Sequence, residues 1–336
     1  MCIRDSSKNI GVFGRIISCL GLLIVPHLGA ETDWAYAPVE NPETPKVDTA
    51  DWTREEMDFF VLAEIEKRDY LPTKPAAKRT LMRRAYLDLH GLPPSPGQIK
   101  AFLSDERPDA WRRLIDELLQ SPRYGERWGR HWLDVARYAD TNGMDEDIAH
   151  PSAWRYRDYV IRSFNKDKPF DRFIVEQLAG DLLPAKDLVQ KREQTVGLGF
   201  LSVGPKMLAC DDPDKMRRDI VDEQMDTMGR AFLGMTIGCA RCHDHKIDPI
   251  SIKDYYGLAG IFMSTKTLTK YSVVAEFHEH DLTKEEHQKK WLEVRRLEGE
   301  QKKKETLKDK KDKLAEEITA LKKGLPAPFR VMGVTE

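Results

Sequence analysis

The sequence predicts a mostly α-helical protein, with a multi-helix globular domain followed by a charged helical spacer or coiled coil. Three observations support this fold class. From residue 51 onward, apolar residues recur at spacings of three and four, as they do on the buried face of a helix. Residues that typically begin and end helices bracket these segments. We find no convincing run of alternating polar and apolar residues, the pattern that indicates a β-strand.

The expected helices follow one another along the chain. The first begins with a capping box formed by Thr53 and Glu56. The next ones span about residues 75–89, 96–103, 109–119, 124–138, 152–164 and 170–178. A long helix then opens at Asp212, an N-cap residue followed by proline at the first helical position. Its apolar stripe is expected to include Met228 and Met235.

The segment 279–324 is dominated by Lys, Glu and Leu. Its apolar residues form two sets that do not share one heptad register: Leu307, Leu314, Ile318 and Leu321, and separately Trp291, Val294 and Leu297. The segment is therefore either a coiled coil that pairs chains or separates domains, or a solvated helical hairpin, and we prefer the hairpin. Residues 325–336 look like the approach to a following domain.

The first 30 residues are expected to be a signal peptide. Arg4, Lys8 and Arg15 flank or precede the apolar stretch 16–25, and Ala30 provides a small residue at the expected cleavage point. Such a stretch is too short to cross a bilayer, which takes about 20 apolar residues. We therefore expect an exported protein, periplasmic or associated with the cell surface. A linker over 31–50 would then lead into a helical domain over 51–265.

The charge of the chain limits its partners. It carries 54 basic and 56 acidic residues, for a formal net charge of −2. Proteins that bind nucleic acid usually present a net basic surface, because the release of counterions from phosphates drives binding. The composition therefore argues against nucleic acid as a partner.

The strongest chemical signal is the pentapeptide CARCH, which runs from Cys239 to His243. Two cysteines separated by two residues can each add a thiol across one vinyl group of haem, which forms two thioethers. The histidine that follows is then placed beneath the iron as its proximal ligand. Export agrees with this interpretation, because bacterial c-type haem is attached outside the cytoplasm. Cys239, Cys242 and His243 are therefore predicted to hold one covalent haem c.

Three alternatives stay open for this segment. The cysteines could form a disulfide, the pentapeptide could be a coincidence, or zinc could bind to Cys239, Cys242, His243 and His245. Four zinc ligands within seven residues are much closer together than the usual two separated pairs. Cys210 is the third cysteine expected in the mature chain, and three cysteines do not suit a disulfide framework.

Longer motifs surround the pentapeptide: residues 127–140 (RWGRHWLDVARYAD), 204–209 (GPKMLA), 219–224 (DIVDEQ), 239–250 (CARCHDHKIDPI) and 254–262 (DYYGLAGIF). Together they resemble an uncharacterised domain family of large exported proteins from planctomycetes and related bacteria. In those proteins the domain commonly follows a planctomycete-type cytochrome c domain and precedes a second uncharacterised domain. The resemblance covers roughly residues 51–265. It implies export, a CxxCH site and a following domain beyond residue 336, and it leaves the activity open.

The distal ligand of the iron is sought among the methionines. Met207 follows a Gly-Pro pair, whereas Met228 and Met235 share the apolar stripe of the long helix and are better explained by core packing. His245 is too close in sequence to His243 to bind the opposite face of the same iron. We therefore rank Met207 first and keep an open, five-coordinate iron as the alternative. A methionine ligand favours electron transfer, and an open iron favours catalysis.

A second group of polar residues lies upstream, beside two tryptophans, Trp128 and Trp132. On a helix, His131, Asp134 and Tyr138 would share a face, and Arg137 would pair with Asp140 three residues on. The candidate catalytic residues of a cleft that stacks a sugar on the tryptophans are His131, Asp134, Arg137 and Asp140. Alternatively, oxygens within residues 140–147 bind calcium. We prefer a third interpretation, a salt-bridged helix end that its tryptophans pack against the core.

Two functions of different classes therefore remain. The first is an exported haem c domain for electron transfer or other redox chemistry, with an unidentified redox partner protein, in a multidomain system linked to polysaccharide degradation. The second is a hydrolase- or lyase-like domain with a polar cleft at residues 131–147 and a structural or metal-binding CxxCH segment. A red protein with a Soret band would favour the first function, and a colourless protein containing zinc or calcium would favour the second.

Overall fold

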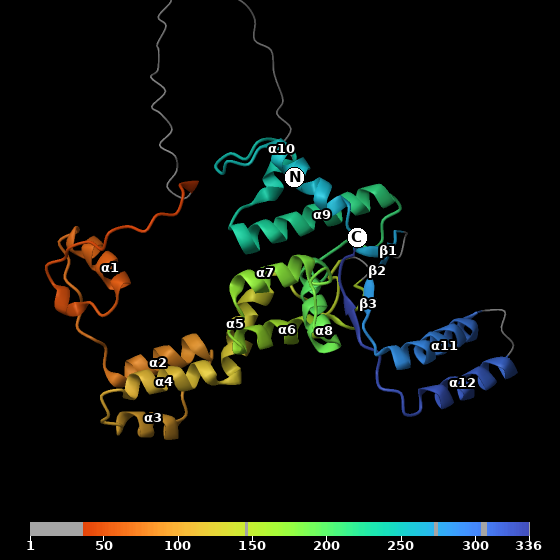
Figure 1. The fold of residues 1–336 in the computed structure, drawn as a ribbon, viewed down its shortest axis with the longest axis horizontal. Helices are drawn as coiled ribbons and strands as arrows, with labels where there is room; N and C mark the ends of the chain where they lie inside the picture. The colour runs from red at the N-terminus through yellow and green to blue at the C-terminus, as the bar shows by residue number, and fades with distance from the viewer. Residues whose placement is uncertain (1–35, 145–146, 272–274, 304–307, 336) are drawn as a thin grey trace, which may run out of the picture. The chain divides into compact units, whose positions relative to one another are not determined.

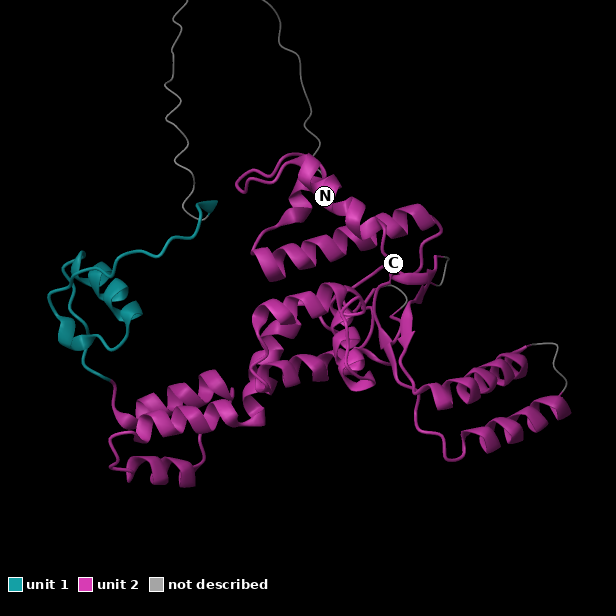
Figure 2. Ribbon diagram, viewed as in Figure 1, with its two compact units in different colours: residues 1–75 teal, residues 76–336 magenta. Residues whose placement is uncertain are grey.

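The structure is a computed structural model that describes residues 36–144, 147–271, 275–303 and 308–335. The expected signal peptide over residues 1–30 lies outside the described residues. The chain divides into two compact units, residues 1–75 and residues 76–336, which are coloured separately in Figure 2. Within the described ranges, no helix combines the length and the apolar character needed to span a bilayer.

The first unit contains a short 3-10 turn, η2 (Ala50–Trp52), and the helix α1 (Glu56–Glu66). The predicted capping box of Thr53 and Glu56 is wrong. The hydroxyl of Thr53 donates back to the carbonyl of Ala50 at 2.6 Å, so it is not available to the helix. Glu55 is the N-cap residue instead and forms the capping box with Asp58.

The second unit is built from helices and confirms the mostly α-helical prediction (Figure 1). Its α-helices are α2 (Lys78–Leu89), α3 (Pro96–Leu103), α4 (Ala110–Gln120), α5 (Pro122–Val135), α6 (Ala153–Asn165), α7 (Phe170–Ala179), α8 (Leu188–Gly197), α9 (Pro213–Met228), α10 (Ile252–Met263), α11 (Glu285–Lys302) and α12 (Lys308–Lys322). Short 3-10 or π turns are η3 (Leu198–Leu201), η4 (Gly229–Leu233) and η5 (Ile237–Arg241). The sequence patterns did not predict α8 or α10.

Two short antiparallel sheets also occur, although the sequence shows no alternating pattern for them. The strand β1 (Leu268–Lys270) pairs with β2 (Glu276–Phe277), and β3 (Glu279–Asp281) pairs with β4 (Arg330–Met332). Strands of two or three residues are too short to show a period of two, which explains why the sequence does not reveal them. Val331, Met332 and Val334 are buried in the main core, so these residues pack with the helices of the second unit. That residues 325–336 lead into a following domain stays a prediction.

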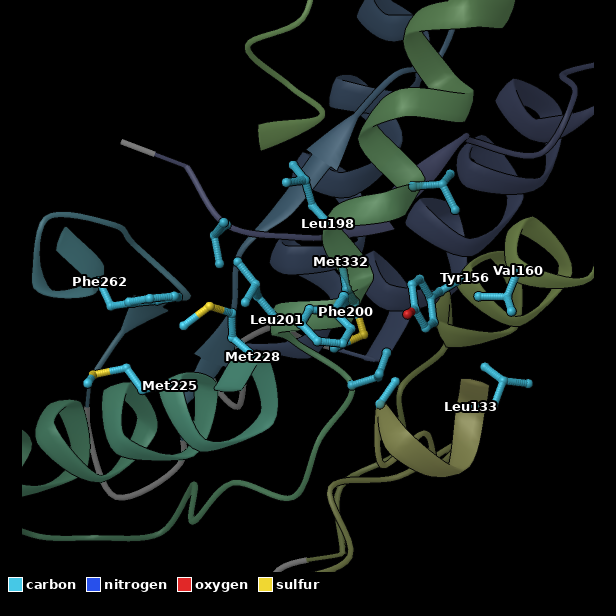
Figure 3. Close-up of a cluster of buried hydrophobic side chains, with 14 of the residues drawn as sticks. Leu133, Tyr156, Val160, Leu198, Phe200, Leu201, Met225, Met228, Phe262 and Met332 are labelled. Atoms are coloured by element: carbon cyan, nitrogen blue, oxygen red, sulfur yellow. The ribbon is translucent and has the colours of Figure 1, made fainter. Parts of the chain in front are cut away.

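The main core lies among α5, α6, α9, α10, η3 and β4, and Figure 3 shows part of it. On α6 the buried residues Tyr156, Tyr159, Val160 and Ser163 fall on one helical face. The helix α5 approaches α6 very closely, because a Cβ atom at Gly125 would lie 2.4 Å from the carbonyl oxygen of Ile161. A side chain at that position would push the two helices apart.

The helices α11 and α12 pack against each other within the chain, as the preferred hairpin interpretation expects. The residues buried between them are Val294 and Leu297 from α11 and Leu314 and Ile318 from α12, with Trp291 and Leu321 beside them. Apart from Leu307, which lies outside the described residues, the two apolar sets of the sequence therefore face each other across the hairpin, and neither needs to share one register with the other.

Candidate functional site

The CxxCH segment rests on a platform formed by α9 and α10. Asp212 caps α9 by accepting a hydrogen bond from the backbone of Lys215 at 2.9 Å, as predicted. The helix ends at Met228 and continues as the π turn η4, after which Gly234 takes a left-handed conformation with φ of 67°. Met235 therefore does not lie on the long helix, and that part of the prediction is wrong. Beyond it, η5 packs against both α9 and α10.

The geometry of η5 places both cysteines on one exposed face. A 3-10 helix has three residues per turn, so side chains three positions apart point in the same direction. Ile237 and Ala240 are buried, with 4% and 0% of their surface exposed. Cys239 and Cys242 are exposed free thiols. The turn thus presents two thiols outward while its opposite face is fixed in the core.

Arg241 fixes the middle of the pentapeptide to α9. Its guanidinium group donates to Asp222 at 3.0 Å and to Asp219 at 3.4 Å. From α10, the hydroxyl of Tyr255 donates to Asp222 at 2.7 Å, and the hydroxyl of Tyr256 donates to the carbonyl of Arg241 at 3.2 Å. Burial and the bond to Asp222 raise the pKa of Tyr255. The backbone between the two cysteines is therefore held from two helices.

His243 is exposed, and one of its ring nitrogens is already oriented. Nδ1 lies 2.8 Å from the carbonyl oxygen of Asp244, which can only accept a hydrogen bond, so Nδ1 carries the proton. The lone pair of the neutral ring is then on Nε2. Metal-binding histidines characteristically show this arrangement, with the far nitrogen donating to a carbonyl or carboxylate and the near nitrogen facing the metal.

His245 has a structural role in the loop that follows. Its Nδ1 accepts hydrogen bonds from the backbone of Asp248 at 2.7 Å and of Ile247 at 3.3 Å, and its Nε2 lies 3.0 Å from the hydroxyl of Thr236. Both nitrogens are therefore used within the protein. In the part of the chain that the structure describes, no three His, Cys, Asp or Glu side chains gather as a metal site. The four residues of the zinc alternative are thus not brought together.

Met207 lies in the loop between η3 and α9 and is 36% exposed. Its neighbours Lys206 and Leu208 are buried, with 2% and 0% of their surface exposed, so the side chain of Met207 points away from the core side of the loop. Its ligation of iron stays a prediction.

The upstream polar residues do not form the predicted constellation. Asp134 is exposed and pairs with Arg130 at 3.0 Å on the surface of α5. The helix ends at Val135, and Arg137 then takes a left-handed conformation with φ of 57°. The predicted pair of Arg137 with Asp140 is wrong, because Arg137 turns to Glu223 of α9 at 2.8 Å. The predicted shared helical face with Tyr138 is wrong for the same reason, since Tyr138 lies beyond the helix.

The remaining residues of that group also have local partners. His131 is exposed on α5 and its ring packs against Trp128, with centroids 5.5 Å apart. Asp140 accepts a hydrogen bond from the hydroxyl of Tyr138 at 2.6 Å. In the proposed calcium loop, the side chain of Asn142 is buried and bonded to the backbone of Ile148 and Lys206. Residues 145 and 146 of that loop lie outside the described part of the chain.

A buried ion cluster connects three of the sequence motifs and was not predicted. Lys206, whose side chain is fully buried, lies with its Nζ 2.9 Å from Oε2 of Glu223. Arg137 contacts the other carboxylate oxygen and also donates to Thr227 and to the carbonyl of Glu223. Burial lowers the pKa of Lys206, and the carboxylate of Glu223 opposes that effect. The three charged residues are far apart in sequence, so no local spacing could have revealed the cluster.

His150 lies beside this cluster and is 4% exposed. Neither ring nitrogen has a hydrogen-bond partner among the described residues. The backbone of Ala139 and the charge of Asp140 favour the charged form of the ring, but their effect is smaller than that of burial and of Lys206. Burial, together with the charge of Lys206, lowers the pKa of His150 from 6.5 to about 4. The ring, which packs edge-on against Phe277, is therefore neutral at pH 7.

This pKa predicts a stability that depends on pH. The unfolded chain binds a proton at His150 more readily than the folded chain, so protonation favours unfolding. This contribution to the unfolding free energy is about 3 kcal/mol above pH 6.5 and is lost as the pH falls from 6.5 to 4. His150→Phe should flatten the unfolding free energy between pH 6.5 and 4, as measured by urea denaturation, whereas His131→Gln should not. If the unfolding free energy of His150→Phe depends on pH as steeply as that of the wild type, then His150 is not the buried, neutral ring described above.

Comparison with known proteins gives one family. The model PSCyt2, described as a protein of unknown function (DUF1549), matches residues 56–267. The matched residues run from the start of α1 past the end of α10 and include both the CxxCH segment and the buried ion cluster. No curated protein and no solved structure matches the chain significantly.

Proposed function

The chain belongs to this family of proteins of unknown function, since the match covers well over half of it, and from that premise we propose that it is an exported domain that holds one covalent haem c for electron transfer. One observation carries the proposal. The 3-10 turn η5 presents the thiols of Cys239 and Cys242 on its exposed face, directly before a histidine whose Nδ1 is hydrogen-bonded to a carbonyl.

The donor set fits haem c. Each thiol would add its S–H across one vinyl group, which forms a thioether without a leaving group. Cys239 and Cys242 would hold the porphyrin edge, and Nε2 of His243 would bind the iron. The bound group would supply a one-electron redox centre. The contacts of Arg241 with Asp219 and Asp222 keep the backbone between the attachment points fixed, and a fixed ligand geometry lowers the reorganisation that accompanies electron transfer.

The rest of the proposal concerns context. Attachment of haem c takes place outside the cytoplasm, so the proposal includes export to the periplasm or cell surface and a protein redox partner. Met207 stays the proposed distal ligand, with an open iron as the alternative. We do not carry forward the hydrolase-like function, because Asp134, Arg137 and Asp140 each have separate partners and do not converge on one cleft.

The proposal is tested by asking whether the wild-type protein carries covalently bound haem. The full chain, expressed with its N-terminal segment in a host with a c-type maturation system, should remain haem-stained after denaturing electrophoresis. Its alkaline pyridine spectrum should be that of haem with both vinyl groups saturated. A colourless protein, or haem that is lost on denaturation, would remove the basis of the proposal.

A further inference from the structure

A pocket of about 220 Å³ opens beside α5, α6 and α7, in a part of the molecule that the proposed haem site does not use. Most of its wall is aromatic. The rings that line it belong to Tyr124 and Trp132 of α5, Phe164 of α6, and Phe170 and Phe173 of α7. Asp167 and Lys168, from the short connection between α6 and α7, complete the lining together with Ser163.

Neighbouring rings in the pocket stand nearly perpendicular to one another. The planes of Trp132 and Phe170 make an angle of 85°, and those of Tyr124 and Phe164 make an angle of 80°. Trp132 and Phe173 are also edge-to-face, with centroids 4.9 Å apart. The rings that line the pocket therefore lie in several different planes and do not form one flat platform. The indole N–H of Trp132 is directed to Gln177 and Tyr156.

The polar groups of the pocket leave one charge without a partner. Lys168 is bonded to Glu176 at 2.5 Å, lies 3.6 Å from Glu193 and rests over the ring of Tyr159. Ser163 donates its hydroxyl to the carbonyl of Tyr159. Asp167, by contrast, is exposed, and its carboxylate has no partner among the residues that the structure describes. The pocket therefore presents aromatic surfaces and one free negative charge.

We propose that this pocket binds a methylated ammonium group. Aromatic rings attract a cation through the negative potential of their faces, and rings on several sides can surround it. A quaternary ammonium has no N–H groups to satisfy, so one carboxylate is a sufficient polar partner. A primary ammonium or a sugar would leave several donors or hydroxyls unsatisfied here, since Ser163 and Lys168 are already bonded. An anion would be repelled by Asp167.

The backbone conformation of Asp167 decides which substitution can test its charge. Its φ is 48°, in the left-handed region that Asp and Asn adopt more readily than most residues. Asp167→Asn can keep that conformation and removes only the charge. Asp171, an exposed carboxylate in the first turn of α7, provides the matched control, because Asp171→Asn removes a neighbouring charge outside the pocket lining.

The experiment is calorimetric titration of the full-length protein with choline and with 3,3-dimethyl-1-butanol, which has the same shape without the charge. Choline should bind about tenfold more tightly than the neutral alcohol. Asp167→Asn should weaken choline binding several-fold and leave the alcohol unchanged, and Phe170→Ala should weaken both. Asp171→Asn should behave like the wild type.

A trimethyl-lysine peptide, titrated in parallel, distinguishes the two sources of this chemistry. Tighter binding of the peptide indicates a modified protein side chain as ligand, and tighter binding of choline indicates a free small molecule. Equal binding of choline and the neutral alcohol, or no binding of either ammonium probe, would overturn the proposal.

Discussion

We expect the double variant Cys239→Ala/Cys242→Ala to lose the covalent haem of the proposed site and to keep its fold. Both thiols are exposed, and the residues that anchor the turn, Ile237 and Ala240, are unchanged. Exposed substitutions of this kind change the free energy of unfolding by less than about 1 kcal/mol. Haem staining after denaturing electrophoresis should therefore fall to background, and the urea midpoint should stay close to that of the wild-type chain expressed without the maturation system, because a bound haem would itself stabilise the native state.

Cys210→Ala is the matched control. Cys210 is also a free thiol, but it lies in the loop before α9 and is partly buried. It should retain full staining, and each single variant at Cys239 or Cys242 should retain the weaker staining of one thioether. Wild-type staining in the double variant would show that these cysteines do not attach the haem.

We expect the variant Glu223→Gln to lose about 3–5 kcal/mol of unfolding free energy, the usual cost of removing one partner from a buried ion pair. The side chain of Lys206 is fully buried, and Glu223 is the carboxylate that contacts both Lys206 and Arg137. Glutamine has nearly the same volume but leaves these two cations without a counter-charge. The loss should appear as a lower urea midpoint with an unchanged slope.

Two further variants identify the cause of that loss. Asp226 lies one turn away on α9 and pairs with the exposed Arg230 at 2.8 Å, so Asp226→Asn should cost less than about 1 kcal/mol. Adding Lys206→Met to Glu223→Gln removes one uncompensated buried charge and should restore a large part of the stability. A Glu223→Gln variant as stable as Asp226→Asn would show that the cluster does not form as described.

Helices with an apolar stripe could be located from the sequence, and those with a polar buried face could not. The helix α3 has the predicted limits, because a serine cap, a proline and a glutamine mark its start. By contrast, α8 buries Gln194 and Thr195, so its sequence shows no apolar stripe. The helix α10 was missed although Ser251 and Asp254 form a capping box that the sequence displays. The apolar spacing also predicted that the long helix would reach Met235, but α9 ends at Met228, where the π turn η4 begins.

The candidate site shows the same division between local and long-range information. The spacing of Cys239, Cys242 and His243 is local, and it identifies the segment without any structure. The pairing of Lys206 with Glu223 joins a loop to a helix and leaves no periodic trace. The predicted pair of Arg137 with Asp140 is wrong because the spacing rule for helical pairs assumes a continuous helix. The helix α5 ends at Val135, before both residues.

Because β3 pairs with β4, the hairpin formed by α11 and α12 is inserted between two neighbouring strands. The backbone N–H of Leu282 donates to the carbonyl of Phe329 at 2.8 Å, so the excursion formed by residues 283–328 starts and finishes at neighbouring points. The entropy of closing such a loop grows only with the logarithm of its length, by about 0.6 kcal/mol for each doubling. Evolution can therefore lengthen, shorten or replace this excursion at little thermodynamic cost to the domain that carries it, and length variation among homologues is expected to concentrate there.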